Sequence, residues 1–147
     1  MYRNQSGCAD PTFEAVMNKM MREYRAKQRE KRRWRDEIKS RPRVYVVSRF
    51  AGDVTENIRK ARRYCRFVAS RKCIPFASHL LYPQFLDDTN PKEREIGLLF
   101  GTVWLERCDE VWCFGTERSS GMESEIHEAK AKRIPIRYFT EEMEELK

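Results

Sequence analysis

Short apolar runs alternate with longer segments of helical periodicity over most of the chain. β-Branched and aromatic residues concentrate in runs typical of buried parallel strands. Between these runs, apolar residues recur every three to four positions, which predicts amphipathic helices. The predicted strands are 44–47, 74–77, 110–114 and 134–138, and the predicted helices are 53–72, 91–107 and 120–132.

Strict alternation of strands and helices predicts a parallel sheet with right-handed crossovers. The strand order 2-1-3-4 makes a small doubly wound α/β domain of the flavodoxin or Rossmann type, with about four to five strands. The first and third strands are then neighbours at the switch point, where ligands bind in such folds. The last eight residues, TEEMEELK, are expected to form a short acidic helix capped by Thr140.

A second region precedes this domain. Thr12 is a plausible N-cap for a long helix that runs to about residue 40, and Pro42 marks its end. The boundary divides the chain into a lead-in and basic helix, 1–41, and an α/β domain, 42–147. The first turns of the helix carry apolar residues at helical spacing, which are Phe13, Val16, Met17, Met20, Met21 and Tyr24.

The net charge of +7 is concentrated in one segment. Residues 18–43 contain 12 Lys or Arg and 4 Asp or Glu, a net charge of +8, whereas residues 44–147 carry no net charge. A basic helix with interleaved Trp34 and Tyr24 suits nucleic acid, bound mainly through its phosphates. A mixed-charge helix is as often simply solvated, or serves as a dimer arm.

Composition excludes several classes of protein. The sequence contains no run of 18 apolar residues, so it predicts no membrane span. The first residues lack the apolar region of a signal peptide. Five cysteines without a CxxC pair, and only two histidines, indicate no zinc site. We therefore expect a reduced, cytoplasmic protein with no membrane partner, no metal and no cofactor.

The segment CDEVWCFGTERSSGMESEIHEA, residues 108–129, carries the strongest functional pattern. A strand passes through a Gly/Ser turn into a helix that begins near Ser119 or Ser120, and Gly121 and Glu125 follow. Serine hydroxyls and backbone N–H groups at a helix N-terminus favour a phosphate, with a carboxylate close by. The alternative is ordinary N-capping of a βα turn with solvated glutamates.

Two more loops are expected at the same edge of the sheet. The loop SRFAG after the first strand supplies Ser48, Arg49 and Gly52, and arginine suits bidentate phosphate binding. The pattern is neither GxGxxG nor a Walker loop, so ATP or typical NAD binding is unsupported. The aromatic loop 79–90 adds His79 and Asp88. His79 is a candidate to act as a general acid or to contact the base of a ligand; the alternative is that it only caps a strand end.

The quoted residues resemble the nucleoside 2-deoxyribosyltransferase-like superfamily, which includes the 2′-deoxynucleoside 5′-phosphate N-hydrolases. The shared pattern is Ser–x–Gly–x–x–x–Glu, an apolar residue, two variable positions and Ala. Over about residues 43–139, the likeness is greatest to a phage and bacterial branch of unassigned activity. Here the pattern is made by Ser119, Gly121, Glu125, Ile126 and Ala129, preceded by Asp109, with Tyr45 in the first strand.

This resemblance implies roles for three residues. Glu125 matches the nucleophile that attacks C1′ of the sugar, Tyr45 matches the residue that positions it, and Ser119 matches the phosphate ligand. It also implies a nucleoside or nucleotide ligand and a homodimer whose subunits complete each other's sites. One position departs from the pattern, because Gly101 stands where the superfamily has an aspartate that handles the leaving base; Asp87, Asp88, Glu93 and His79 are candidate substitutes.

Three hypotheses follow from the sequence. The first is an N-glycosidase or deoxyribosyltransferase-like protein acting on a nucleotide. The second is a non-catalytic protein that senses or sequesters a nucleotide in the same pocket, as Gly101 favours. The third is a nucleic-acid-associated accessory protein that acts through residues 18–43.

Overall fold

The computed structural model describes residues 3, 6–7 and 10–147, which form two compact units, residues 1–40 and 41–147. The first unit contains α1 (Pro11–Lys39), a helix of 29 residues in which no residue is buried. Its N-cap is Asp10 rather than the expected Thr12, because the Asp10 carboxylate accepts the N–H groups of Thr12 and Phe13. Pro11 then occupies the first helical position, where its missing N–H costs nothing.

The second unit confirms the predicted α/β fold, a five-stranded sheet in the order β2-β1-β3-β4-β5. The first four strands are parallel, and β5 is antiparallel to β4. The strands are β1 (Arg43–Val47), β2 (Ile74–Phe76), β3 (Glu110–Phe114), β4 (Ile136–Phe139) and β5 (Glu145–Leu146).

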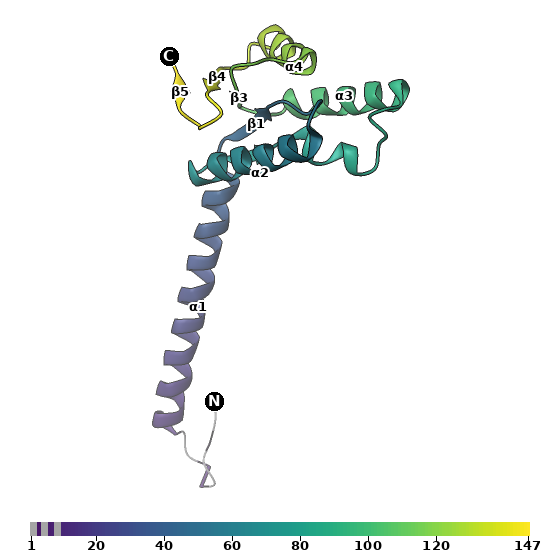
Figure 1. The fold of residues 1–147 in the computed structure, drawn as a ribbon. Coiled ribbons are helices and arrows are strands. Elements are labelled where there is room, and N and C mark those ends of the chain that lie inside the picture. Colours follow the sequence, from purple (N-terminus) through teal and green to yellow (C-terminus); the bar gives the residue numbers. More distant parts are fainter. Residues whose placement is uncertain (1–2, 4–5, 8–9) are drawn as a thin grey trace. The chain divides into compact units, whose positions relative to one another are not determined.

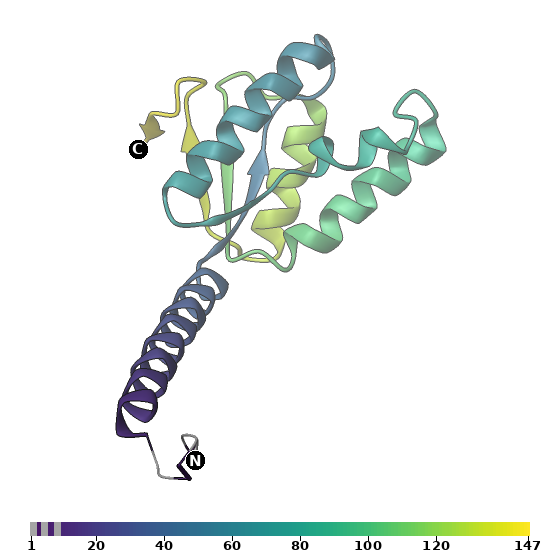
Figure 2. The ribbon, with the colours of Figure 1, turned by 90° about the horizontal axis from the view of Figure 1, so that it is seen from below.

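Helices cover both faces of the sheet, with α2 on one face and α3 and α4 on the other (Figures 1 and 2). They are α2 (Val54–Ser70), α3 (Pro91–Leu105) and α4 (Ser120–Ala131). Between β2 and α3, the expected loop contains two 3₁₀ turns, η1 (Ser78–Leu80) and η2 (Tyr82–Gln84). Among the described residues, no helix is both long enough and apolar enough to cross a membrane.

The alternation of side chains along β1 sends neighbouring residues into different cores. Val44 and Val46 pack with Tyr64 of α2, whereas Tyr45 and Val47 join the core beneath α3 and α4. Successive strand residues point to opposite faces of a sheet, so this separation follows from the strand period alone. It places the Tyr45 side chain on the same face as α4.

The predicted C-terminal helix is wrong. Residues 140–144 form a turn in which the Thr140 N–H donates to Glu144 O, and β5 then pairs with β4. Arg137 of β4 binds Glu145 through two N–H groups, with N–O distances of 2.6 and 2.7 Å. These cross-strand contacts outweigh a weak local preference for helix in so short a segment.

Candidate active site

Glu125 lies on the face of α4 that packs against the sheet. Ser119 caps this helix by accepting the Met122 N–H on its hydroxyl, at 3.3 Å. Met122, Ile126 and Ala129 are buried and fix the rotation of α4 on the sheet. Glu125 shares their face, so its carboxylate points inward rather than into bulk solvent.

Two hydroxyl groups bind the same oxygen of this carboxylate. The Tyr45 hydroxyl donates to Glu125 Oε1 at 2.8 Å, and the Ser78 hydroxyl donates to Oε1 at 3.4 Å. No buried polar side-chain atom of the described residues lacks a hydrogen-bond partner. Since both hydroxyl groups bind Oε1, Oε2 is left toward the cavity that Glu125 lines.

Burial changes the ionisation of this pair. It raises the pKa of Glu125 to about 7, although the hydrogen bonds from Tyr45 and Ser78 lower it. Burial, together with the neighbouring Glu125 carboxylate, raises the pKa of Tyr45 well above its usual range. Tyr45 therefore stays protonated and donates, while Glu125 changes charge near neutral pH, as suits a reacting carboxylate.

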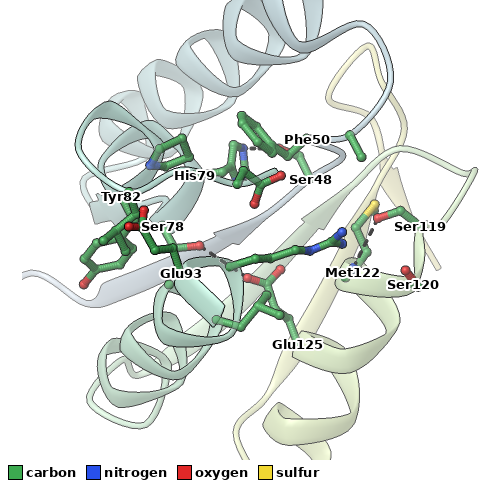
Figure 3. Close-up of a pocket in the computed structure, with 18 residues that line it drawn as sticks. Ser48, Phe50, Ser78, His79, Tyr82, Glu93, Ser119, Ser120, Met122 and Glu125 are labelled. Carbon is green, nitrogen blue, oxygen red and sulfur yellow. Dashed lines mark hydrogen bonds between the residues drawn. The ribbon is translucent and has the colours of Figure 1, made fainter. Parts of the chain in front are cut away.

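The cavity beside Glu125 lies at the carboxyl ends of β1 and β3 and has a volume of about 110 Å³ (Figure 3). Phe50 and Tyr82 contribute aromatic walls, and Leu86 and Leu98 add apolar surface. The structure brings most of the sequence-predicted site residues to this one cavity, namely Ser48, His79, Asp88, Ser119, Ser120, Gly121 and Glu125.

Ser48 and His79 form a polar pair in the cavity wall. Ser48 Oγ lies 3.1 Å from His79 Nε2, and the Phe50 ring packs 5.8 Å from the imidazole, centre to centre. Burial lowers the pKa of His79 to about 4. His79 is therefore neutral at physiological pH, where it is suited to hydrogen bonding rather than to acting as a charged acid.

Arg49 and Gly52 lie elsewhere. Both line a neighbouring cavity on the α2 side of the β1 loop, where Arg49 pairs with Glu117 at 3.3 Å. Gly52 has a φ of +100°, so it serves the turn into α2, which Asp53 caps. In this structure neither residue faces Glu125.

Three charged residues from the 79–94 region also line the Glu125 cavity: Asp88, Glu93 and Arg94. Arg94 is the one lysine or arginine among the described residues of its lining. Asp87 does not line it; its carboxylate accepts the N–H and hydroxyl of Thr89, which lowers its pKa. An ionised, locally bonded Asp87 is poorly suited to protonate a leaving base.

Gly101 lies directly against the Tyr45–Glu125 pair. A Cβ at this position would lie 2.9 Å from the Tyr45 hydroxyl and 3.4 Å from Ser78 Cβ. Real Cβ atoms essentially never approach so closely, so a larger residue would require Tyr45 to move. Glycine at this position thus leaves the space that the Tyr45 hydroxyl occupies.

Sequence reasoning missed Ser78 and Arg94. Ser78 follows β2 by two residues, at the edge of the sheet where the strand ends meet. That placement in the sequence could have identified it as a candidate site residue. Arg94 lies in the first turns of α3, and its direction depends on how α3 packs.

The α/β unit is similar to one family of proteins and to a solved structure. A family model described as Domain of unknown function (DUF7768) matches residues 42–139. Among solved structures, a 2-deoxyribosyltransferase from Bacillus psychrosaccharolyticus, described as a biocatalyst for nucleoside synthesis, is similar with a TM-score of 0.52. The two share 14% sequence identity over 67% of this chain and 72% of that one, so the similarity shows a shared fold. A search of curated proteins finds no match.

Proposed function

The chain belongs to the family described as Domain of unknown function (DUF7768), and from its site we propose that it cleaves or transfers the N-glycosidic bond of a nucleotide. The observation that carries this proposal is the half-buried Glu125 carboxylate, which lines a cavity and has Oε1 held by Tyr45 and Ser78. The fold shared with a 2-deoxyribosyltransferase supports the choice of substrate class.

The reaction divides into two steps. Glu125 Oε2 attacks C1′ of the sugar, the bond between C1′ and the base nitrogen breaks, and the base leaves with the bonding electrons and takes a proton from solvent water. Water, or the nitrogen of a second base, then attacks C1′ and releases the Glu125 carboxylate. Tyr45 stays protonated throughout and keeps the carboxylate oriented.

The N-terminus of α4 is suited to the phosphate of such a substrate. The first N–H groups of a helix have no partner within the helix, and Ser119 Oγ occupies only that of Met122. The N–H groups of Ser120 and Gly121 remain for an anion, and Arg94 lines the same cavity. We therefore favour a nucleoside 5′-monophosphate over an uncharged nucleoside.

A chromatographic screen tests this function. Purified protein is incubated with ribo- and deoxyribonucleoside 5′-monophosphates, the matching nucleosides and NAD, and free base is measured. Release of base from a monophosphate supports the proposal. Thermal stabilisation by a nucleotide without any base release favours the second candidate, a non-catalytic nucleotide-binding protein. The specific observation in favour of this candidate is Gly101, which cannot handle a leaving base as an aspartate would.

We also propose that the α/β unit forms a homodimer through α3. Large apolar side chains of this helix are 37–59% exposed. The helix lies next to the Glu125 cavity, whose volume of about 110 Å³ is smaller than the roughly 300–1,000 Å³ of typical ligand pockets. A nucleotide would extend beyond the cavity, and a second subunit on α3 would cover it. The exposed residues are Ile96, Leu98, Leu99, Phe100, Val103 and Trp104.

The double substitution Leu99→Asp and Val103→Asp is expected to produce a monomer, because it places two charges in the proposed apolar interface. Light scattering at micromolar concentration should give half the wild-type mass. Arg63→Asp, at an exposed position of α2, is the control and should remain dimeric. A wild-type protein that is already monomeric would contradict the proposal.

A further candidate function, nucleic-acid binding by α1, is favoured by a row of arginines. Arg22, Arg25 and Arg29 are three and four residues apart and so lie on one face of a helix that has no buried residue. Such a row can follow a phosphate backbone, and binding would depend strongly on salt.

Replacing Arg22, Arg25 and Arg29 together with glutamine should weaken binding to a DNA or RNA oligomer. The slope of log affinity against log salt should become shallower by about 0.9 for each phosphate that the protein no longer neutralises. Fluorescence anisotropy over a salt series measures this slope. The control replaces three exposed arginines of α2, namely Arg62, Arg63 and Arg66. Equal weakening in both variants would mean that α1 has no special part.

A further inference from the structure

The carboxylate of Glu125 is held unequally at its two oxygens. Both hydroxyl donors, from Tyr45 and Ser78, converge on Oε1, while Oε2 is left toward the cavity. Hydrogen bonds of this kind fix the rotation of a carboxylate about its last torsion, which is otherwise broad. The result is one oxygen that anchors and one that can react.

The two donors come from different elements that meet at this point. Tyr45 is in β1 and is fully buried, while Ser78 begins η1, two residues after the end of β2. Both hydroxyls lie within 3.5 Å of the position that a Cβ at Gly101 would take. Loss of Ser78 would therefore leave Tyr45 as the single donor to Glu125 in the described part of the chain.

Gly101 is the third member of this arrangement. The position of its missing Cβ lies within 3.5 Å of the Tyr45 hydroxyl and of Ser78 Cβ and Oγ. Any side chain there would push the Tyr45 hydroxyl away from Glu125 or displace Ser78. The adjacent turn of α3 has no such constraint, because a Cβ at Gly97 would make only ordinary contacts, at 3.5 and 3.9 Å.

We propose that Ser78 is a second positioning residue for Glu125, and that Gly101 is required because it leaves room for the hydroxyls of Tyr45 and Ser78 to hold one carboxylate oxygen. This inference rests on the proposed function for its catalytic meaning. The glycine at 101 is then part of the site's construction, and an aspartate placed there would disturb Glu125 rather than restore an acid.

The pKa of Glu125 tests the proposal without any substrate. Carbon-13 NMR of protein with labelled glutamate carboxyls reports it, and the Glu125 signal is assigned by its absence in Glu125→Gln. Ser78→Ala should raise the pKa by roughly half a unit to one unit, since a donor to the ionised form is removed. Ser124→Ala, at the exposed neighbouring position in α4, should leave it unchanged.

Gly101→Ala should raise the same pKa, and Gly97→Ala on the same helix should not. If Ser78→Ala does not fold, Gly101→Ala and Ser78→Thr still test the proposal. Ser78→Thr keeps the hydroxyl, so the pKa of Glu125 should equal the wild-type value. An unchanged pKa in folded Ser78→Ala, or in folded Gly101→Ala, would overturn the corresponding half of the inference. Absence of base release by the wild type would count against the proposed function alone, because these pKa values do not depend on turnover.

Discussion

Glu125→Gln will abolish base release while leaving nucleotide binding largely intact. The amide keeps the shape of the side chain and an oxygen that can accept from Tyr45 and Ser78, but it has no carboxylate oxygen able to attack C1′. We expect a loss on the order of 10³-fold or more in kcat, as when a covalent nucleophile is removed. Single-turnover assays with quantified free base measure this loss, and calorimetry measures binding.

Glu123→Gln supplies the matched control. Glu123 is on the same helix but exposed, beside Arg118 at 3.6 Å, so its substitution should change turnover little. If Glu125→Gln retained wild-type base release, Glu125 would not be the nucleophile. If wild type and variant bound nucleotide equally and neither released base, the non-catalytic candidate would stand.

The same Glu125→Gln substitution will stabilise the folded protein above pH 7. In the folded state the pKa of Glu125 is about 7, whereas the unfolded chain has the ordinary value of 4.5. Between these values the folded state binds the proton more tightly, so the contribution of Glu125 to stability falls as pH rises from 4.5 through 7. Above pH 7 the buried charge costs about 3 kcal/mol, from 1.36 kcal/mol per pKa unit.

Glutamine has no charge to bury, so it avoids this cost at every pH. At pH 8 the free energy of unfolding of the variant should be about 3 kcal/mol higher than that of the wild type, which corresponds to a rise in Tm of roughly 12 °C for a domain of this size. At pH 5 the two proteins should differ little, because Glu125 is then protonated in the folded state. Thermal or urea unfolding at both pH values, with Glu123→Gln as the control, measures the difference; a gap independent of pH would contradict the burial of the charge.

Loss of base release together with a gain in stability in Glu125→Gln would show that the same carboxylate lowers stability and carries the reaction. Burial of the carboxylate lowers stability when it is charged, and it also raises its pKa to about 7, so Glu125 changes charge near neutral pH. The two hydroxyl donors limit the cost, since both favour the ionised form. Without them the carboxylate would stay protonated to higher pH and would be a poorer nucleophile.

The sequence alone determined the α/β sheet, the order of its first four strands and the turn that opens α4. These features depend on the spacing of apolar residues within one element and on the connections between elements, which are local properties of the chain. The same period puts Tyr45 on the opposite face from Val44 and Val46, but only the structure shows that Tyr45 faces α4. The Ser119–Gly121 turn and Glu125 were found for the same reason, because strand, turn and helix follow one another directly.

Only the tertiary structure decided which side chains meet. Arg49 follows β1 as expected but pairs with Glu117 in the neighbouring cavity, a choice made between loops 68 residues apart. Residues 145–146 form a strand because β4 offers a free edge and Arg137 binds Glu145, contacts that no local pattern contains. Ser78, Gly101 and Glu125 lie far apart in sequence and meet around the Tyr45 hydroxyl, because packing of α3 and α4 on the sheet fixes directions that periodicity leaves open.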